Sequence, residues 1–457
     1  PVANVGDAIQ GRAAGVQVIT SGQPGSNPTF RIRGTGTIGN NDPLIVVDGM
    51  PLTGGLNQIN MNDVESMQIL KDASSTAIYG ARGANGVVII STKRGSIGKS
   101  ALTFDVSSAT SEATNMVHVL NASQFASLHN DILNNAGLSP NPDFQNPSSL
   151  GKGTDWVNAY FNAGFQNNYT LAYTTGNEKS KVYTSVNVFD QKGIILNTDY
   201  KRYVLQFNSD TKLSENLKFG NSLKLNHDVK TQGDVNIGNA LLSLPTQPIY
   251  RENGNFSGPI GQPLYSGNLD NPIGKATIVD NTTKGYNIQG NIFGELTFLK
   301  NLKFKTILGA EANFWKTRTW VPSYAWDTNI GPNAFLSESS NQAITLLWDN
   351  TLTFQKKFDN GINLTAVVGT SAQENKFEYI SGSIQNFASE NTQTLNNGID
   401  QATLHGSGSE WAIFSTFARG SFDYKNRYYL IATVRRDGSS RFGQGNKYGT
   451  FPSGSLA

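Results

Sequence analysis

From about Ala101 onward, apolar and polar residues alternate along segments that are longer than most strands of soluble proteins. One segment alternates Val182, Thr184, Val186 and Val188 with Lys181, Ser185 and Asn187, and another alternates Ile288, Ile292, Leu296 and Phe298 with Asn287, Gln289, Asn291 and Glu295. Successive side chains of a β-strand point to opposite faces, so a period of two places the apolar residues together. The pattern predicts about twelve long strands, each with one apolar and one polar face.

The connections between these strands alternate in length. The short ones lie near Gly176–Ser180, Ser214–Asn216, Lys300–Asn301, Asp359–Gly361 and Lys425–Asn426. The long ones lie near Thr110–Asn162, Asp190–Asp199, Val229–Thr283, Arg318–Ser340, Lys376–Ser409 and Gly438–Lys447, and the first of them holds a predicted helix over Ala122–Ala136. A transmembrane β-barrel has short turns on one side of the membrane and long loops on the other, whereas a soluble β-sandwich has no reason to sort loops this way.

The composition is consistent with a barrel, and it argues against a helical membrane protein and against a nucleic-acid-binding protein. Apolar residues make up 37%, Gly is abundant at 47 residues, and no apolar run is long enough for a transmembrane helix. Aromatic residues gather at strand ends and suggest interfacial girdles: Tyr200, Tyr203, Phe354, Phe358, Tyr424, Tyr428 and Tyr429. The net charge of +2 gives no general field for binding nucleic acid. The absence of Cys decides little.

Residues 1–98 follow a different pattern, which predicts a small mixed α+β domain. We expect strands at Val16–Ile19, Thr29–Arg33, Leu44–Val47, Met67–Leu70 and Val87–Thr92, with helices over Val5–Gly15 and Ala73–Tyr79. Asp48-Gly49 closes one strand, Asn62 or Asp63 caps a short helical turn, and Gly80 ends the second helix. The remainder, 99–457, forms the strand-rich second domain.

The first domain resembles the plug domain of TonB-dependent outer-membrane transporters, and it is most similar to the SusC/RagA branch of Bacteroidota. The matching motifs are RIRG (Arg31–Gly34), DPLIVVDG (Asp42–Gly49), ILKDASSTAIYGARGANG (Ile69–Gly86) and VVIISTKRG (Val87–Gly95). Near the other end, RRDGSSRFG (Arg435–Gly443) and YGTFPSGSLA (Tyr448–Ala457) also resemble the barrel of this family. The motifs occur in family order and span nearly the whole chain.

The resemblance implies an antiparallel transmembrane β-barrel that encloses the plug in the outer membrane of a Gram-negative cell. A plugged barrel has about 22 strands, so the strands here correspond to about half of one. The implied function is energised import of a large nutrient, an oligosaccharide more often than a peptide. The implied partners are the TonB–ExbB–ExbD complex and a SusD-like surface lipoprotein. A siderophore or cobalamin receptor and a surface β-protein without transport activity are the alternatives.

The sequence offers no catalytic site, metal site or cofactor site. The four His residues, His118, His129, His227 and His405, lack ligand spacing with one another or with a carboxylate motif. The G-x-G-x-x-G run Gly34–Gly39 is followed by Asn40-Asn41-Asp42-Pro43, which prevents the helix that a dinucleotide site requires. The S-x-x-K run Ser96–Lys99 has no companion motif. We therefore expect no enzymatic activity.

The family resemblance suggests where substrate binds. The matching positions on the outward tips of the plug are Arg33, Met50, Pro51, Leu52, Thr53 and Tyr79, and a long loop adds Trp320, Tyr324 and Trp326. Aromatic faces stack on sugar rings and also contact peptide side chains. An alternative is that these aromatic residues pack the rim or contact the lipoprotein.

The resemblance also suggests how the plug is held. In related transporters, cations of the plug contact carboxylates of the barrel wall, and Arg33 and Lys71 match their positions, although siderophore transporters usually have Arg where Lys71 stands. The candidates on the plug are Arg31, Arg33, Lys71 and Arg82, and those on the strands are Glu295, Glu311 and Glu374. A few charge-assisted bonds would retain the plug without fixing it permanently. The alternative is that these are solvated surface charges.

The half-complete strand count generates a first prediction, since an open barrel edge is not viable in lipid. We expect the full reading frame to encode a signal peptide and a TonB box upstream, and about ten further alternating strands downstream. Sequencing the reading frame checks this, and a natural stop codon directly after Ala457 would contradict it.

Overall fold

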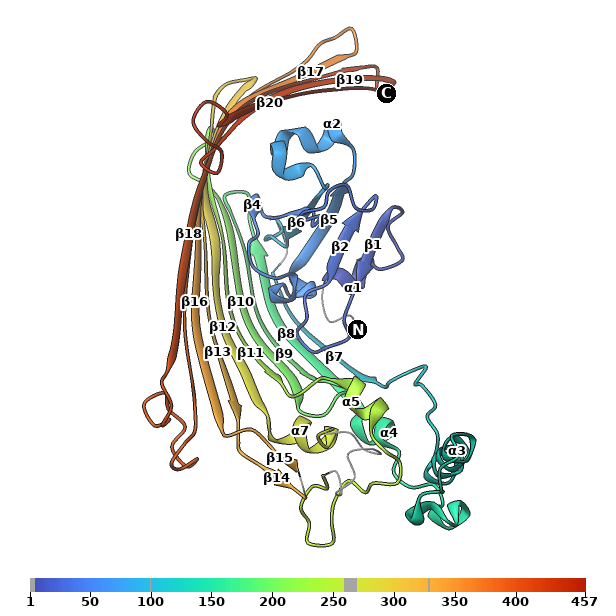
Figure 1. Cartoon of the computed structure of the whole chain (residues 1–457). Coiled ribbons are helices and arrows are strands. Elements are labelled where there is room, and N and C mark those ends of the chain that lie inside the picture. Colours follow the sequence, from blue (N-terminus) through green and yellow to red (C-terminus); the bar gives the residue numbers. More distant parts are fainter. Residues whose placement is uncertain (1–4, 99, 259–268, 328) are drawn as a thin grey trace.

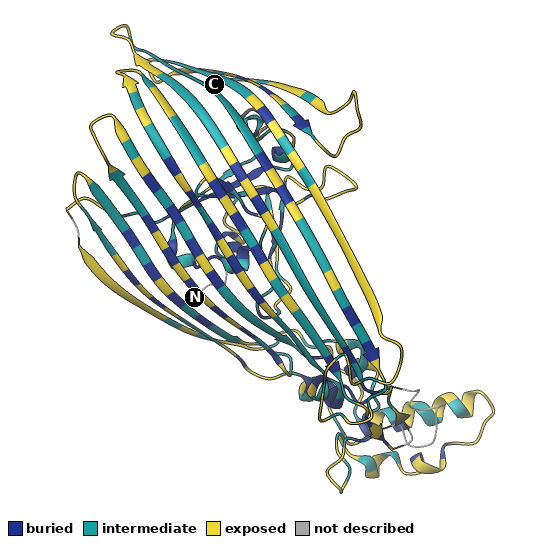
Figure 2. Ribbon diagram, turned by 90° about the vertical axis from the view of Figure 1, so that its left-hand side faces the viewer, coloured by how far each residue is buried: buried dark blue, intermediate teal, exposed yellow. Residues whose placement is uncertain are grey.

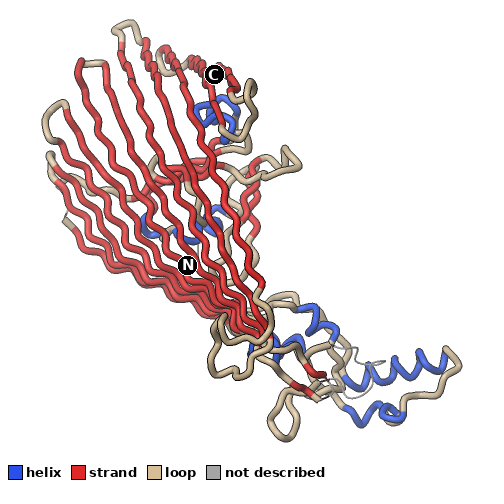
Figure 3. The backbone as a smooth tube through the Cα atoms, turned by 60° about the vertical axis from the view of Figure 1, so that its left-hand side comes forward, coloured by secondary structure: helices blue, strands red, loops and turns tan. Residues whose placement is uncertain are grey.

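The computed structural model describes residues 5–98, 100–258, 269–327 and 329–457. Its largest element is a twelve-stranded antiparallel sheet in which neighbours along the chain pair with each other. The strands are β7 (Ala101–Ser111), β8 (Gly164–Gly176), β9 (Ser180–Lys192), β10 (Thr198–Lys212), β11 (Leu217–Gln232), β12 (Asp280–Leu299), β13 (Leu302–Val321), β16 (Phe335–Lys357), β17 (Ile362–Gln385), β18 (Thr403–Tyr424), β19 (Tyr428–Ser439) and β20 (Tyr448–Leu456). Figure 3 shows these strands as one curved wall. The predicted strand count and partial-barrel fold are confirmed.

The burial pattern of this sheet is the reverse of that in a water-soluble protein, because its polar face is covered and its apolar face is exposed. On β10, Gln206 and Asn208 are 3% and 0% exposed, whereas Leu205 and Phe207 are 39% and 37% exposed. Figure 2 shows exposed and buried residues alternating along the middle strands of the sheet. Water-soluble proteins do not leave such a large apolar face uncovered, while a transmembrane barrel turns its apolar residues toward lipid. The predicted apolar face is therefore the outer one, and the polar face lies inside.

The first domain lies against the concave face of the sheet (Figure 1). Its elements are α1 (Val5–Ile9), β1 (Val16–Ile19), β2 (Thr29–Ile32), β3 (Leu44–Val47), β4 (Met50–Pro51), η1 (Leu56–Gln58), η2 (Met61–Asp63), β5 (Val64–Leu70), α2 (Ala73–Thr76), η3 (Ala77–Gly83) and β6 (Val87–Thr92). The four-stranded sheet β4-β3-β6-β5 has a parallel pair, β3 and β6. Its apolar core includes Val5, Phe30, Leu56, Val88 and Ile90.

The domain differs from the sequence expectations mainly at its helices. The segment expected to be one helix over Ala73–Tyr79 is the short α-helix α2 followed by the 3₁₀ helix η3, and Gly80, which we expected to end it, leaves helical conformation with φ 63° and ψ −149°. The helix expected over Val5–Gly15 ends at Ile9. Asn60, rather than Asn62 or Asp63, caps the short turn η2, because its side chain accepts the backbone N–H of Asn62.

A segment after β6 leads from this domain into the sheet. Gly95 lies so close to the β8–β9 turn that an added Cβ would be 2.3 Å from the Val182 nitrogen and 2.4 Å from the Thr175 oxygen. Only glycine fits this approach. The last described plug strand ends at Thr92 and the sheet begins at Ala101. Residue 99, where we placed the start of the second domain, lies outside the described residues, so the boundary stays a prediction.

The long connections gather at one end of the sheet (Figure 1). They hold α3 (Ala122–Asn135), η4 (Pro142–Phe144), η5 (Pro147–Leu150), α4 (Trp156–Tyr160), α5 (Ile237–Leu242), α7 (Pro272–Ile278), β14 (Ala325–Trp326) and β15 (Asn329–Ile330). The connection expected over Asp190–Asp199 is wrong in length, because β9 and β10 continue into it and leave only 193–197. Residues 259–268 of the connection Val229–Thr283 lie outside the described residues. Among the described helices, none has the length and apolar character needed to cross a membrane.

The exposed apolar face generates a second prediction. Leu308 points outward from the middle of β13 and is 49% exposed. We expect Leu308→Arg to destabilise the whole protein in lipid vesicles by about 2–4 kcal/mol, because an arginine at the bilayer midplane loses its hydration. Thr282→Arg, near the long-connection end of β12, is the control and should cost about 1 kcal/mol or less. Urea titration of vesicle-bound protein measures both, and equal costs would contradict a membrane-facing surface.

Candidate functional site

The centre of the contact between plug and sheet is Glu311, an inward-facing residue of β13 that is 0% exposed. Its Oε2 accepts the backbone N–H and the hydroxyl of Thr53, both at 2.7 Å, and its Oε1 accepts the backbone N–H of Gly54 at 3.0 Å. On the sheet, Asn287 donates to the same carboxylate at 3.3 Å. A buried carboxylate is stable only when such donors replace water. Glu311 thus links the loop after β4 to the wall.

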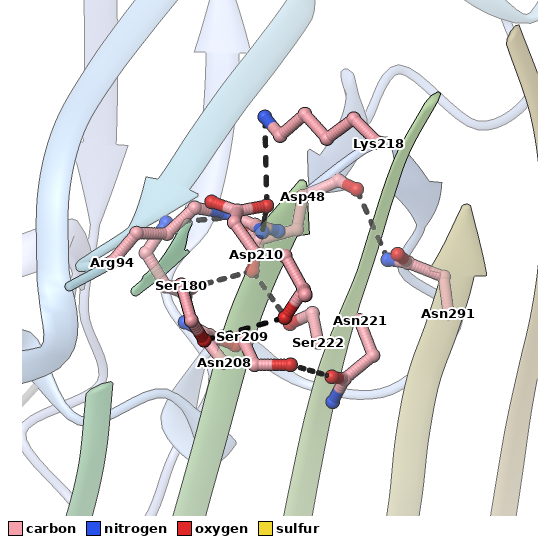
Figure 4. A network of polar contacts seen from close by, with 12 residues as sticks. Asp48, Arg94, Ser180, Asn208, Ser209, Asp210, Lys218, Asn221, Ser222 and Asn291 are labelled. Atoms are coloured by element: carbon pink, nitrogen blue, oxygen red, sulfur yellow. Dashed lines mark hydrogen bonds and ion pairs between the residues drawn. The ribbon is translucent and has the colours of Figure 1, made fainter. Parts of the chain in front are cut away.

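A second contact surrounds Asp48, at the turn between β3 and β4. Its carboxylate accepts the backbone N–H of Thr92 at 2.9 Å within the plug, and the hydroxyl of Ser222 on β11 at 2.9 Å. Its backbone carbonyl accepts the amide of Asn291 on β12 at 3.1 Å. Figure 4 shows Asp48 lying between these strands. Asp tolerates the φ of 49° found here better than most residues.

The end of the plug forms an ion pair with the sheet. Arg94 donates to the Asp210 carboxylate of β10 at 2.8 Å, and the Lys218 ammonium lies 3.7 Å from the same carboxylate (Figure 4). Next to it, the amide of Asn208 donates to the Lys93 carbonyl at 2.7 Å. Charge-assisted bonds therefore hold the plug where its chain joins the wall.

Two further buried charges bridge the plug and the strands β9 and β10. Asp63 of the plug accepts the hydroxyls of Tyr183 at 2.8 Å and Ser185 at 2.5 Å. Arg202, which is 2% exposed, donates to the plug carbonyls of Asn57 and Ile59. Nothing in their spacing distinguishes these two residues from other polar residues, and they were not among our candidates.

On the far strands of the sheet, η3 packs on β19 and β20, and fewer hydrogen bonds reach the plug. Arg82 donates to Gln373 of β17, and the backbone N–H of Ala81 donates to Asp437 of β19 at 3.1 Å. Arg435 donates to the Ile78 carbonyl. Burial, together with the positive charges of Arg435 and Arg441, lowers the pKa of Arg82 to about 10. Arg82 therefore stays charged at neutral pH.

The other candidate cations of the plug make their bonds within the plug. Arg31 pairs with Asp42, Arg33 pairs with Asp72 at 2.6 Å, and Lys71 donates to the Ala14 carbonyl. Their local partners occupy the groups that we expected to reach the wall. The structure therefore brings Arg82 and Glu311 into the contact and leaves Arg31, Arg33 and Lys71 out of it.

Two of the three candidate carboxylates also differ from the expectation. Glu295 lies 3.1 Å from Lys303 of the neighbouring strand, a pairing within the wall. Glu374 is exposed on the outer face, because the inward positions around it belong to Gln373 and Asn375. Only Glu311 of the three reaches the plug.

The loop aromatics proposed for stacking are covered by protein. Trp320 is 5% exposed and packs edge-to-face on Phe387 with ring centroids 4.9 Å apart. Tyr324 and Trp326 stack on each other at 4.0 Å and are 9% and 5% exposed. A buried ring offers no face to a sugar. In this structure the three residues hold the loops together, as the packing alternative expects.

The plug candidates divide in a similar way. Leu52 and Thr53 line a polar cavity of about 550 Å³ on the plug. Met50 is buried against the wall near Gly309, and Tyr79 packs against Leu44, where burial raises the pKa of its phenol. A cavity of about 1080 Å³ lies on the outer apolar face beside Leu308 and Trp348, so lipid rather than substrate would fill it. No group of three His, Cys, Asp or Glu side chains suited to a metal occurs among the described residues.

Comparison with known proteins gives a consistent assignment. Residues 1–87 match the family described as TonB-dependent Receptor Plug Domain. A TonB-dependent receptor of Formosa agariphila is 33% identical, over 99% of this chain and 46% of that receptor. The TonB-dependent receptor SusC of Bacteroides thetaiotaomicron is 27% identical, over 98% of this chain and 47% of SusC. The structure of the RagAB peptide transporter superimposes with a TM-score of 0.87 at 26% identity, over 99% of this chain and 55% of that one.

The chain begins with a TonB-dependent receptor plug domain and is similar over nearly its whole length to TonB-dependent receptors of the SusC and RagA type. The receptor is an outer-membrane protein, and its relatives are receptors and transporters, not enzymes. The chain spans about half the length of the curated relatives that it matches. The siderophore receptor PirA of Acinetobacter baumannii superimposes with a TM-score of 0.58 at 14% identity, over 100% of this chain and 56% of PirA, and shares only the fold.

The contact at Glu311 generates a third prediction. Glu311→Ala leaves the backbone donors of Thr53 and Gly54 without their acceptor, at about 1–3 kcal/mol for each donor that water does not reach. We expect a loosened plug and a larger single-channel conductance of the intact receptor in planar bilayers. The control is Glu374→Ala, which removes an exposed carboxylate from the outer face and should leave the conductance unchanged. Equal conductance of the two variants would contradict the role of Glu311.

Proposed function

We propose that the receptor imports a large nutrient across the outer membrane, driven by the TonB–ExbB–ExbD complex of the inner membrane. The observation that carries this proposal is the polar contact between plug and wall. The contact is made by polar and charged side chains that bond across it, namely Glu311, Asp48, Asp63 and Arg202. A domain that is fixed permanently in place would be expected to bury apolar side chains there instead. Water can replace each of these bonds, so a pulled plug loses little free energy per contact.

The polar cavity on the plug is the proposed substrate-binding surface. Its lining combines amides, hydroxyls and two charged groups, and includes Asn27, Thr29, Asp42, Thr53, Arg82 and Asn85. Amides and hydroxyls suit the hydroxyl-rich surface of a sugar. The guanidinium of Arg82 already bonds to Gln373 and lies 5.6 Å from the Trp411 ring centre, so part of its binding capacity is directed at the wall. These features favour an oligosaccharide.

A peptide is the second candidate substrate. It is supported by the match to the RagAB structure, whose title describes that protein as a peptide transporter. A peptide backbone also bonds to amides and hydroxyls. A SusD-like surface lipoprotein is the proposed partner for either substrate. The proposed binding residues are Leu52 and Thr53, which line the cavity, with Met50, Pro51 and Tyr79 packed nearby.

The test, our fourth prediction, is uptake by energised cells that carry the intact receptor and its lipoprotein. We expect labelled oligosaccharides to accumulate, and collapse of the proton gradient to stop it. Thr29→Trp fills the cavity and should lower uptake at least tenfold without changing the conductance of the plugged barrel. Ser66→Trp, at an exposed position of β5 outside the cavity lining, is the control.

The outcomes separate the candidates. Accumulation of peptides but not oligosaccharides would replace the first substrate class with the second. Accumulation of neither class in energised cells would contradict import. Equal uptake by the Thr29→Trp and Ser66→Trp variants would move the binding surface away from the plug cavity.

A further inference from the structure

A row of ring side chains crosses the outer face of the sheet near its long connections. Tyr203, His227, Tyr286 and Phe314 are direct neighbours on β10, β11, β12 and β13. His227 stacks on Tyr286 with ring centroids 4.4 Å apart and on Tyr203 at 6.1 Å. Such rows mark the level where the hydrocarbon core of a membrane ends.

The spacing along β12 supports this level. The outward residues from Tyr286 to Phe298 are apolar or glycine: Ile288, Gly290, Ile292, Gly294 and Leu296 lie between them. At about 3.3 Å per residue and a tilt near 45°, this segment spans roughly 28 Å of membrane thickness. It therefore crosses the hydrocarbon once, and Tyr286 lies at the boundary on the side of the long connections.

Directly beyond this boundary, two lysines face each other. Lys284 and Lys316 occupy paired positions of β12 and β13, one outward position past Tyr286 and Phe314. Like charges directly opposite on a sheet destabilise it. Nearby cations have carboxylate partners, since Lys201 lies 3.6 Å from Asp190 and Arg318 lies 3.2 Å from Asp280. Within the described part of the chain, neither Lys284 nor Lys316 has a carboxylate within 4.0 Å.

The two lysines are also the place where two grooves of the outer face meet. One groove, of about 720 Å³, continues toward Arg318 and Glu338, and the other, of about 750 Å³, continues toward Tyr286 and Gln342. Both grooves include Lys284, Lys316 and the hydroxyl-bearing Ser340. The groove of about 750 Å³ thus brings the rings of Tyr286 and Phe314 together with the two ammonium groups.

We propose that Lys284 and Lys316 bind a phosphate group of an anionic glycolipid of the outer leaflet. The acyl chains of this lipid lie along the apolar band below Tyr286, which places its headgroup at the level of the lysines. One phosphate between the two ammonium groups removes the repulsion across β12 and β13 and supplies the missing counter-charge. The contact fixes how deeply this part of the wall sits in the membrane.

The position of the lysines favours lipid over other anions. A soluble phosphate would gain the charge contact but not the apolar contact with the band below Tyr286. A protein partner at this level would have to displace lipid from the outer face. The structure therefore assigns the site to a molecule that carries both a phosphate and acyl chains.

The test, our fifth prediction, compares lipid binding by the full receptor in detergent. We expect Lys284→Gln combined with Lys316→Gln to weaken the binding of purified lipid A roughly thirtyfold, because each cation near an anionic membrane surface contributes about a factor of five. The matched control combines Lys201→Gln with Lys376→Gln, which removes two outward lysines that already have carboxylate partners. The double arginine variant at positions 284 and 316 should retain binding.

Three results would overturn the proposal. The first is that the glutamine variant and the control bind lipid A with equal affinity. The second is that lipid A without its phosphates binds as tightly as intact lipid A. The third is that inorganic phosphate alone stabilises the receptor as much as lipid A does. The glutamine variant should fold, because both lysines are exposed and Gln is a polar side chain only one atom shorter than Lys. Unchanged heat-dependent gel migration verifies this, and the arginine variant separates loss of charge from loss of fold.

Discussion

The fold depends on the contact between lipid and the apolar outer face of the sheet. Because the apolar side chains of β7 to β20 face outward, the inner face consists mainly of polar side chains that must find partners away from bulk water. The plug supplies those partners: Thr53 and Gly54 for Glu311, and the carbonyls of Asn57 and Ile59 for Arg202. The largest apolar core described lies within the plug, around Phe30, Val88 and Ile90, and smaller ones lie among the long connections, around Trp156 and Trp320.

This division determines which parts of the fold can be predicted from sequence. In a membrane, long segments with a period of two can form only the strands of a β-barrel whose apolar side chains face lipid. The strands and the direction of their two faces therefore followed from the alternation. The plug strands Leu44–Val47 and Val87–Thr92 followed from short apolar runs between turn residues. The segment Ala73–Tyr79 is helical and Gly80 leaves helical conformation directly after it, as expected, but its second half is a 3₁₀ helix rather than an α-helix, which the spacing of apolar residues does not distinguish.

The partners of the polar residues were much harder to predict. Arg33 and Lys71 have the charge to reach the wall, but Asp72 and the Ala14 carbonyl lie closer. Glu374 lies on a strand with polar residues on both faces, so its charge does not reveal its side. Arg202 and Asp63 looked like ordinary polar residues, and only the docking of the plug makes them buried bridges. Such contacts depend on the approach of segments far apart in sequence, which local patterns do not encode.

The contacts between plug and wall are unevenly distributed. Hydrogen bonds to β9, β10 and β11 are numerous and involve the buried charges of Asp63 and Arg202 and the half-buried Arg94. On the same side, the chain passes from the plug into the sheet, and Gly95 lies in close contact with the β8–β9 turn. Toward β17 and β19, Arg82, the backbone N–H of Ala81 and the Ile78 carbonyl each make one bond, and η3 packs closely on β19. The two sides of the plug are therefore held differently, by buried charged groups beside the chain connection and by close packing of α2 and η3 on β19 and β20 at the far side.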